Sequence, residues 1–216
     1  MAIQLQGNGG TIAEVDGAGF RAIRTVNMPL DVNGLGSYRI SHLSGTMAAG
    51  LAANSEILQY RWTDATRLAS IHSVTLDGLS GSATAFAAGF GKVDMFVARS
   101  WTVAGGGGTP LTVTTNNGKM RTSHGTTLVG EIRASVTAAC TAGTKTLDTQ
   151  AVGQISLSFG TVVSVQYANQ VSLFDDNGVH PLILAQNEGF VLRATVPATG
   201  TWQFGATIVW SEIAAY

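Results

Sequence analysis

The stretch from residue 187 to residue 210 constrains the fold more than any other part of the chain, because its apolar residues recur at every second position. Such a period is typical of a β-strand, whose side chains alternate between two faces. The apolar positions flank a turn that contains Pro197 and Gly200: Phe190, Leu192, Ala194 and Val196 precede it, and Trp202, Phe204, Ala206, Ile208 and Trp210 follow it. The pattern predicts an antiparallel hairpin with Trp202, Phe204 and Trp210 in the core.

Further strand signals follow one another through the rest of the chain, separated by loops of glycine and small residues. They cover residues 38–43, 56–63, 68–76, 92–101, 110–114, 127–136, 154–159, 170–174 and 182–184. In residues 56–63 apolar and polar side chains alternate, which indicates a half-buried antiparallel strand. Residues 46–54 offer at most one helical turn or a loop, because Gly50 interrupts them. About ten short strands at this spacing predict an all-β, jelly-roll-like antiparallel β-sandwich.

The first 35 residues differ from the rest, because glycines interrupt their short apolar pieces. Such a segment cannot form a core of its own, and ordering it costs about 1 to 2 kcal/mol per residue in backbone entropy. We therefore expect residues 1–35 to form an extended N-terminal arm that lies on its own body or on a neighbour, and residues 36–216 to form the sandwich. The side chains that would hold this assembly arm in place are Ile12, Val15, Phe20 and Ile23.

Charged residues make up 12% of the chain, against about 25% in an average soluble protein. The uncharged polar residues that replace them suit either a threonine-rich β-protein or a surface covered by neighbouring subunits. The net charge of −1 is evenly spread, so the chain lacks the basic face that nucleic-acid binding requires. No apolar stretch approaches the ~20 residues of a membrane span, and the first residues lack the order of a signal peptide. We expect a chain made in the cytoplasm, unprocessed, that binds neither nucleic acid nor membrane.

Residue types that carry catalysis or bind metals occur singly. Cys140 is the sole cysteine, which excludes an intramolecular disulfide, and no neighbour in sequence activates its thiol, so we expect a small buried or half-buried hydrophobe. The histidines lack the spacing of metal ligands, and His42 and His72 are expected to form hydrogen bonds within or beside strands. The four are His42, His72, His124 and His180.

Two glycine-containing segments could be mistaken for ligand-binding loops. Residues 175–178 resemble a calcium loop but lack the later glutamate, and residues 105–108 lack the lysine of a phosphate-binding loop. We expect turns or loops at both, and a further tight turn at residues 116–118. The sequence therefore predicts no metal, no cofactor and no enzymatic activity.

Most of eight aromatic residues follow the inward positions of their strands, which favours a core over a sugar-binding platform. They are Tyr60, Trp62, Phe96, Trp101, Phe190, Trp202, Phe204 and Trp210.

Three segments carry a resemblance to a known class of proteins: residues 17–24 (GAGFRAIR), 45–63 (GTMAAGLAANSEILQYRWT) and 187–205 (NEGFVLRATVPATGTWQFG). They look like segments of virion structural proteins of tailed bacteriophages. The resemblance implies a jelly-roll cement or decoration protein on the capsid exterior, with the major capsid protein as partner and a homotrimer or other homo-oligomer as assembly. It brings no functional residues with it. The alternatives are a phage tail, fibre or adaptor protein, which could bind glycans, and a carbohydrate-binding or carbohydrate-active β-sandwich.

Overall fold

The structure, a computed structural model, describes residues 35–48, 51, 53–81, 84, 87–114, 117–124, 130–159, 166–167, 170–176 and 180–214. These residues form fourteen β-strands and no helix, which confirms the predicted all-β fold. Apart from Leu35, the predicted arm lies outside the described residues, and so do its side chains Ile12, Val15, Phe20 and Ile23. Within the described part of the chain, no helix is long and apolar enough to span a membrane.

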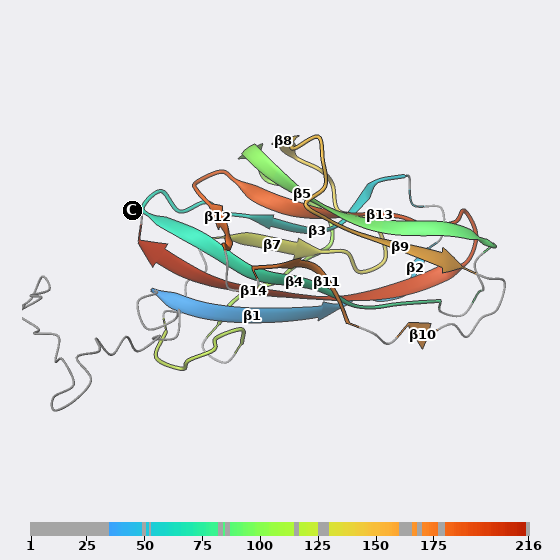
Figure 1. Ribbon diagram of the computed structural model, residues 1–216, viewed down its shortest axis with the longest axis horizontal. Coiled ribbons are helices and arrows are strands. Elements are labelled where there is room, and N and C mark those ends of the chain that lie inside the picture. Colours follow the sequence, from blue (N-terminus) through green and yellow to red (C-terminus); the bar gives the residue numbers. More distant parts are fainter. Residues whose placement is uncertain are drawn as a thin grey trace, which may run out of the picture. The chain divides into compact units, whose positions relative to one another are not determined.

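Two antiparallel sheets pack against each other as a β-sandwich and appear as two layers in Figure 1. Across the first sheet lie β1 (Gly36–Leu43), β14 (Thr201–Ala214) and β4 (Arg67–Gly81). Three short strands follow the far edge of β4, and a fourth pairs with β14: β12 (Leu182–Leu184), β11 (Val171–Asp175) and β10 (Gln166–Tyr167), and β2 (Met47–Ala48).

The second sheet has β3 (Ser55–Arg61), β13 (Gly189–Thr195) and β5 (Gly89–Val103) at its centre. Its edges are made by shorter strands: β6 (Thr109–Pro110) and β7 (Glu131–Ala134) beside β3, and β8 (Thr144–Leu147) and β9 (Gly153–Phe159) beside β5.

The pairing of the eight principal strands is nested. β1 pairs with β14, β3 with β13, β4 with β11, and β5 with β9. The first strand in the chain therefore pairs with the last, the second with the last but one, and so on inward. A long antiparallel hairpin wrapped into two sheets produces this order, which is the jelly-roll topology.

The predicted hairpin of residues 187–210 is wrong, because β13 and β14 lie in different sheets. The link between them, residues 196–200, bridges the two layers. Stacked sheets lie about 10 Å apart, and five residues can span that distance at up to about 3.5 Å each. Pro197 within the link has no N–H to donate to a strand neighbour. The alternation itself is real, since each strand turns its apolar face into the same interior from opposite sides.

The core between the sheets is rich in aromatic side chains. Trp202, Phe204 and Trp210 are fully buried, as predicted, although the strands that carry them are not a hairpin. The ring of Tyr60 stacks on Phe190 with centroids 5.3 Å apart and meets Trp210 edge-on at 5.6 Å. Of the eight aromatic residues expected in the core, six lie in it, and Trp101 is buried outside it, on the outer face of the second sheet.

The eighth, Phe96, is half-buried on the outer face of the second sheet, where it packs with Leu147 on a small separate cluster of Ala98, Trp101 and Val191. Above this face lie two loops, residues 104–108 and 139–143, which we call the outer loops. Gly106 and Thr141 join them by backbone hydrogen bonds of 3.2 and 2.9 Å.

The outer loops explain why β3 differs from the prediction of a half-buried strand. Its residues Glu56 to Tyr60 are all buried, because the outer loops cover the polar side that alternation assigned to solvent. The glycine segment 105–108 belongs to these packed loops, and Gly107 and Gly108 adopt positive φ angles of 66° and 57°. The turn predicted at residues 116–118 has the expected positive φ at Gly118.

Candidate functional site

An open groove of about 350 Å³ lies on the outer face of the first sheet. Its lining comes from β1, β4, β11 and β14 and from the residue before β11: Arg39, Ser73, Thr75, Gln170, Ser172, Asp175, Thr207 and Val209. Hydroxyl and carboxamide groups predominate, so a polar ligand would meet many hydrogen-bonding groups. Among the described residues that line the groove there is no aromatic ring on which a sugar could stack.

The groove contains one positively charged side chain, Arg39, that is available to a ligand. Within the described residues the guanidinium of Arg39 has no hydrogen-bond or ion-pair partner. Nearby on the same face, the hydroxyls of Ser41 and Thr207 lie 2.7 Å apart. The face therefore offers a surface of uncharged hydroxyls around one available positive charge.

A Ser–His–Asp constellation lies on the same sheet. The Nδ1 atom of His72 is 2.8 Å from Oδ2 of Asp176, and its Nε2 atom is 2.8 Å from Oγ of Ser211. The catalytic triad of serine hydrolases has the same sequence of hydrogen bonds, from Asp through His to Ser. Ser211, however, is only 1% exposed, so its hydroxyl is not placed to meet a substrate. We interpret the constellation as an anchor that ties β4, β14 and the end of β11 together.

A β-bulge places His72 in this anchor. Val209 pairs with Ser73 and Trp210 with Ile71, so His72 is the extra residue on β4. Sequence reasoning missed the constellation, because Asp176 and Ser211 are 104 and 139 positions from His72, and no local motif marks them. The expectation that His72 forms hydrogen bonds beside its strand is confirmed.

His42 and His124 also form hydrogen bonds that hold the fold together. His42 Nε2 lies 2.9 Å from the carbonyl oxygen of Ser135, which confirms the expectation for His42. His124 Nδ1 accepts a hydrogen bond from the backbone N–H of Ser37 at 3.0 Å. Among the described residues, no three His, Cys, Asp or Glu side chains gather closely enough to hold a metal ion.

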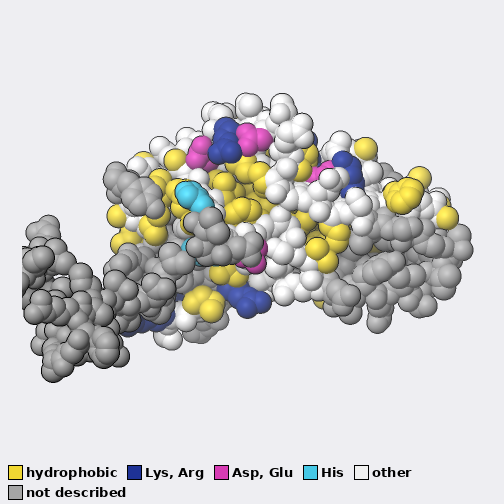
Figure 2. Space-filling view, viewed as in Figure 1, with side chains coloured by type: hydrophobic (Ala, Val, Ile, Leu, Met, Phe, Trp, Pro, Cys, Tyr) yellow, Lys and Arg dark blue, Asp and Glu magenta, His cyan; other side chains and the backbone are white. Residues whose placement is uncertain are grey.

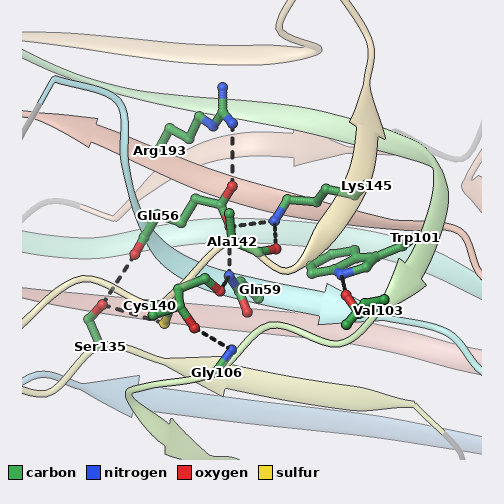
Figure 3. A network of polar contacts seen from close by, with 11 residues as sticks. Glu56, Gln59, Trp101, Val103, Gly106, Ser135, Cys140, Ala142, Lys145 and Arg193 are labelled. Atoms are coloured by element: carbon green, nitrogen blue, oxygen red, sulfur yellow. Dashed lines mark hydrogen bonds and ion pairs between the residues drawn. The ribbon is translucent and has the colours of Figure 1, made fainter.

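A buried network of charges lies between β3 and the outer loops (Figure 3). The carboxylate of Glu56 lies at its centre. It accepts hydrogen bonds from Lys145 Nζ at 2.7 Å, Gln59 Nε2 at 2.6 Å and Arg193 Nη2 at 3.3 Å. The side chains of Glu56 and Lys145 are 4% and 3% exposed. The Lys145 amine also lies 4.3 Å from the ring centroid of Trp101. Burial lowers the pKa of Lys145, and the hydrogen bond that Lys145 donates to Glu56 opposes this effect.

Cys140 lies at the edge of this network, 3.6 Å from the hydroxyl of Ser135. It is 7% exposed, and burial raises the pKa of its thiol. A raised pKa leaves less thiolate, the reactive form. The prediction of a buried, small hydrophobic residue is confirmed.

A second buried carboxylate lies inside the core. Glu212, with a side chain 0% exposed, is 3.0 Å from Nη1 of Arg67. Its Oε1 atom has no hydrogen-bond partner in the described part of the chain, and neither has the hydroxyl of Tyr60. Burial raises the pKa of Glu212 despite the opposing hydrogen bond and charge of Arg67.

Comparison with protein-family models and with curated protein sequences finds no match for this chain.

Proposed function

We propose that this chain is a virion structural protein of a tailed bacteriophage, and specifically a head cement or decoration protein that binds the capsid exterior. The resemblance of residues 17–24, 45–63 and 187–205 to such proteins motivates the proposal. In this role the chain is made in the host cytoplasm, assembles as a homotrimer or other homo-oligomer, and adds to the surface formed by the major capsid protein.

The contrast between the two outer sheet faces is the structural observation that supports this role best. The outer loops and their own small hydrophobic cluster cover much of the second sheet. The groove on the first sheet instead presents hydroxyl groups and the available guanidinium of Arg39. Such a face can bind a large repetitive surface through many weak, uncharged contacts, of the kind found in the polar part of protein interfaces.

The distribution of charge fits the same role. Figure 2 shows charged side chains in small separate groups among uncharged ones on the side that it views. A surface without a strong field of either sign does not select nucleic acid, and it permits close packing of many copies.

The copy number of the chain per particle tests the proposal. We expect purified particles to contain this chain in a fixed ratio to the major capsid protein, close to the number of capsomer sites. Electron micrographs should then show added density over the whole head. A copy number that matches the portal or the tail, with density confined there, would reject the cement role in favour of a tail or adaptor protein.

One observation favours a glycan-binding role as the second candidate. The groove of about 350 Å³ combines hydroxyls, a carboxamide, Arg39 and Asp175, which are groups that can bond to sugar hydroxyls. A glycan array probed with the purified chain tests this role, with Arg39→Ala as the matched variant. Binding that Arg39→Ala removes would support the glycan-binding alternative.

A further inference from the structure

Three side chains of complementary chemistry meet at one oxygen atom under the outer loops (Figure 3). Oε2 of Glu56 lies 2.7 Å from Nζ of Lys145 and 2.6 Å from Nε2 of Gln59. The distance between Nζ of Lys145 and Nε2 of Gln59 therefore cannot exceed the sum of these two hydrogen-bond distances. An amine and a carboxamide that share one carboxylate oxygen can act as the nucleophile and the electrophile of an amide exchange reaction, with the carboxylate as the proton-transfer group.

The surroundings exclude water from the amine. The side chain of Lys145 is 3% exposed, and the indole of Trp101 lies over its Nζ atom at 4.3 Å. Burial lowers the pKa of Lys145, which increases the share of neutral amine, the form that attacks a carbonyl carbon. Exclusion of water also removes the competing hydrolysis of the amide.

The carboxamide of Gln59 is held in place from several sides. Its Nε2 atom also donates to the carbonyl oxygen of Thr141 at 2.9 Å. A Cβ atom on Gly105 would lie 2.1 Å from its Oε1 atom, so the first outer loop packs directly on the amide. Within the described residues Oε1 has no hydrogen-bond partner. The electrophile is thus fixed beside the amine, with an oxygen that no competing donor occupies.

We propose that Lys145 and Gln59 form an intramolecular isopeptide bond, with Glu56 moving the protons. Glu56 takes a proton from the ammonium of Lys145, and the neutral Nζ adds to Cδ of Gln59. Glu56 then protonates Nε2, the Cδ–Nε2 bond breaks, and the nitrogen leaves as ammonia. Glu56 passes a second proton from Nζ to this ammonia, which departs as ammonium, and the Nζ–Cδ bond remains as a neutral amide. One ammonium side chain is consumed and one ammonium ion is released, so the reaction needs no oxidant, reductant or cofactor.

Arg193 has a positioning part in this arrangement. Its Nη2 atom lies 3.3 Å from Oε1 of Glu56, the oxygen that does not touch the reacting groups. Because the guanidinium holds that oxygen, Oε2 stays directed at both Lys145 and Gln59.

The other two lysines of the chain lack this environment. Lys92 is 41% exposed and pairs with Asp94 at 2.6 Å, and Lys119 donates to the carbonyl oxygen of His124 at 2.6 Å. Among the described contacts, neither amine shares a carboxylate with a carboxamide. The inference is therefore specific to Lys145.

Mass spectrometry of the full chain, purified in folded form and then denatured, tests the proposal. We expect an intact mass lower than the sequence mass by one ammonia, and a proteolytic peptide pair that joins Lys145 to Gln59. Lys145→Arg and Glu56→Gln should each restore the full sequence mass. The matched control Lys119→Arg should keep the deficit, because Lys119 lies outside the network.

Peptide mapping separates this cross-link from loss of ammonia elsewhere in the chain. A wild-type mass equal to the sequence mass overturns the proposal, and so does a deficit that persists in Lys145→Arg or maps to other residues. Lys145→Arg retains the positive charge beside Glu56, so it decides the question even if Glu56→Gln does not fold.

Discussion

At the scale of single residues, two of the buried carboxylates, Glu56 and Glu212, have different surroundings. Glu56 is surrounded by the cations of Lys145 and Arg193 and receives a bond from Gln59. Glu212 has one cation, Arg67, whose side chain is 41% exposed. A buried carboxylate with few partners is costly to keep ionised, and this difference leads to a test by pH.

Replacement of Glu212 by Gln should change how stability depends on pH. Burial raises the pKa of Glu212 in the folded chain above its ordinary value of 4.5, so the folded state binds this proton more tightly than the unfolded state. The resulting stabilisation is complete below the unfolded pKa and is lost as pH rises through the folded pKa. The free energy of unfolding of Glu212→Gln relative to wild type should therefore rise with pH, by on the order of 1 kcal/mol.

Urea denaturation from about pH 4 to about pH 8 measures this difference. Glu131→Gln is the control, because it removes a carboxylate that is 46% exposed and paired with Arg61 at 2.9 Å. Its stability relative to wild type should vary little over the same range. A Glu212→Gln curve parallel to that of wild type at every pH would show that Arg67 fully compensates the burial.

The polar residues of the buried network show what the sequence can and cannot predict at this scale. Alternation along residues 56–63 correctly separates Gln59 from its apolar neighbours. The same alternation predicts that Gln59 faces solvent, because a strand pattern does not show which segments cover the outer face of the strand. The groups that cover and bond it, Thr141 and Gly105, lie 82 and 46 positions away, and only the folded chain brings them there.

At the scale of elements, the period of two identifies strands but not their partners. The strands at residues 38–43, 154–159 and 182–184 were all predictable, since their patterns match β1, β9 and β12. The placement of β13 and β14 in different sheets was not predictable, because a hairpin and a link between sheets bury the same alternate residues. Strands of two residues, such as β2 and β10, are too short for a period to show.

Close approach between edge strands of the two sheets can be tested at Gly153. A Cβ atom at this first residue of β9 would lie 1.6 Å from the carbonyl oxygen of Leu173 in β11. Because backbone atoms of β11 cannot move aside cheaply, Gly153→Ala should reduce the free energy of unfolding by about 1 to 3 kcal/mol. Thermal or urea unfolding of the purified variant measures the loss.

Gly89 provides the matched control, since it begins β5 opposite the far end of β9. Its added Cβ would meet Pro197 at 3.6 Å and the carbonyl oxygen of Ala87 at 4.0 Å, both ordinary contact distances. Gly89→Ala should therefore leave the unfolding midpoint nearly unchanged. Equal effects at the two glycines would mean that β9 and β11 have room to separate.

At the scale of the whole molecule, nested pairing makes every principal contact between sheets or strands long-range. β1 pairs with β14 over residues 36–43 and 205–212, so the first and the last strand of the described chain lie side by side. Such pairing requires closure of long loops before it gains contact energy, which slows folding. It also means that residues 36–214 contain both ends of the topology and all of the described core.

Because residues 36–214 contain all strands of the nested pairing, the effect of removing the N-terminal segment can be predicted. Deletion of residues 2–24 removes no strand of the nested pairing, so the truncated chain should keep the far-UV circular dichroism of the full chain. If residues 1–35 form an assembly arm, the deletion should abolish trimer formation or retention on phage particles, because Ile12, Val15, Phe20 and Ile23 are lost with it. Sedimentation analysis of the free protein and co-sedimentation with particles measure the two effects. A full-length chain carrying Phe20→Asp and Ile23→Asp keeps the length but not the apolar contacts, so it should fail in the same way. A truncated chain that still assembles and occupies particles fully would place the interface on the sandwich itself, where the hydroxyl-rich face around Arg39 is the first surface to mutate.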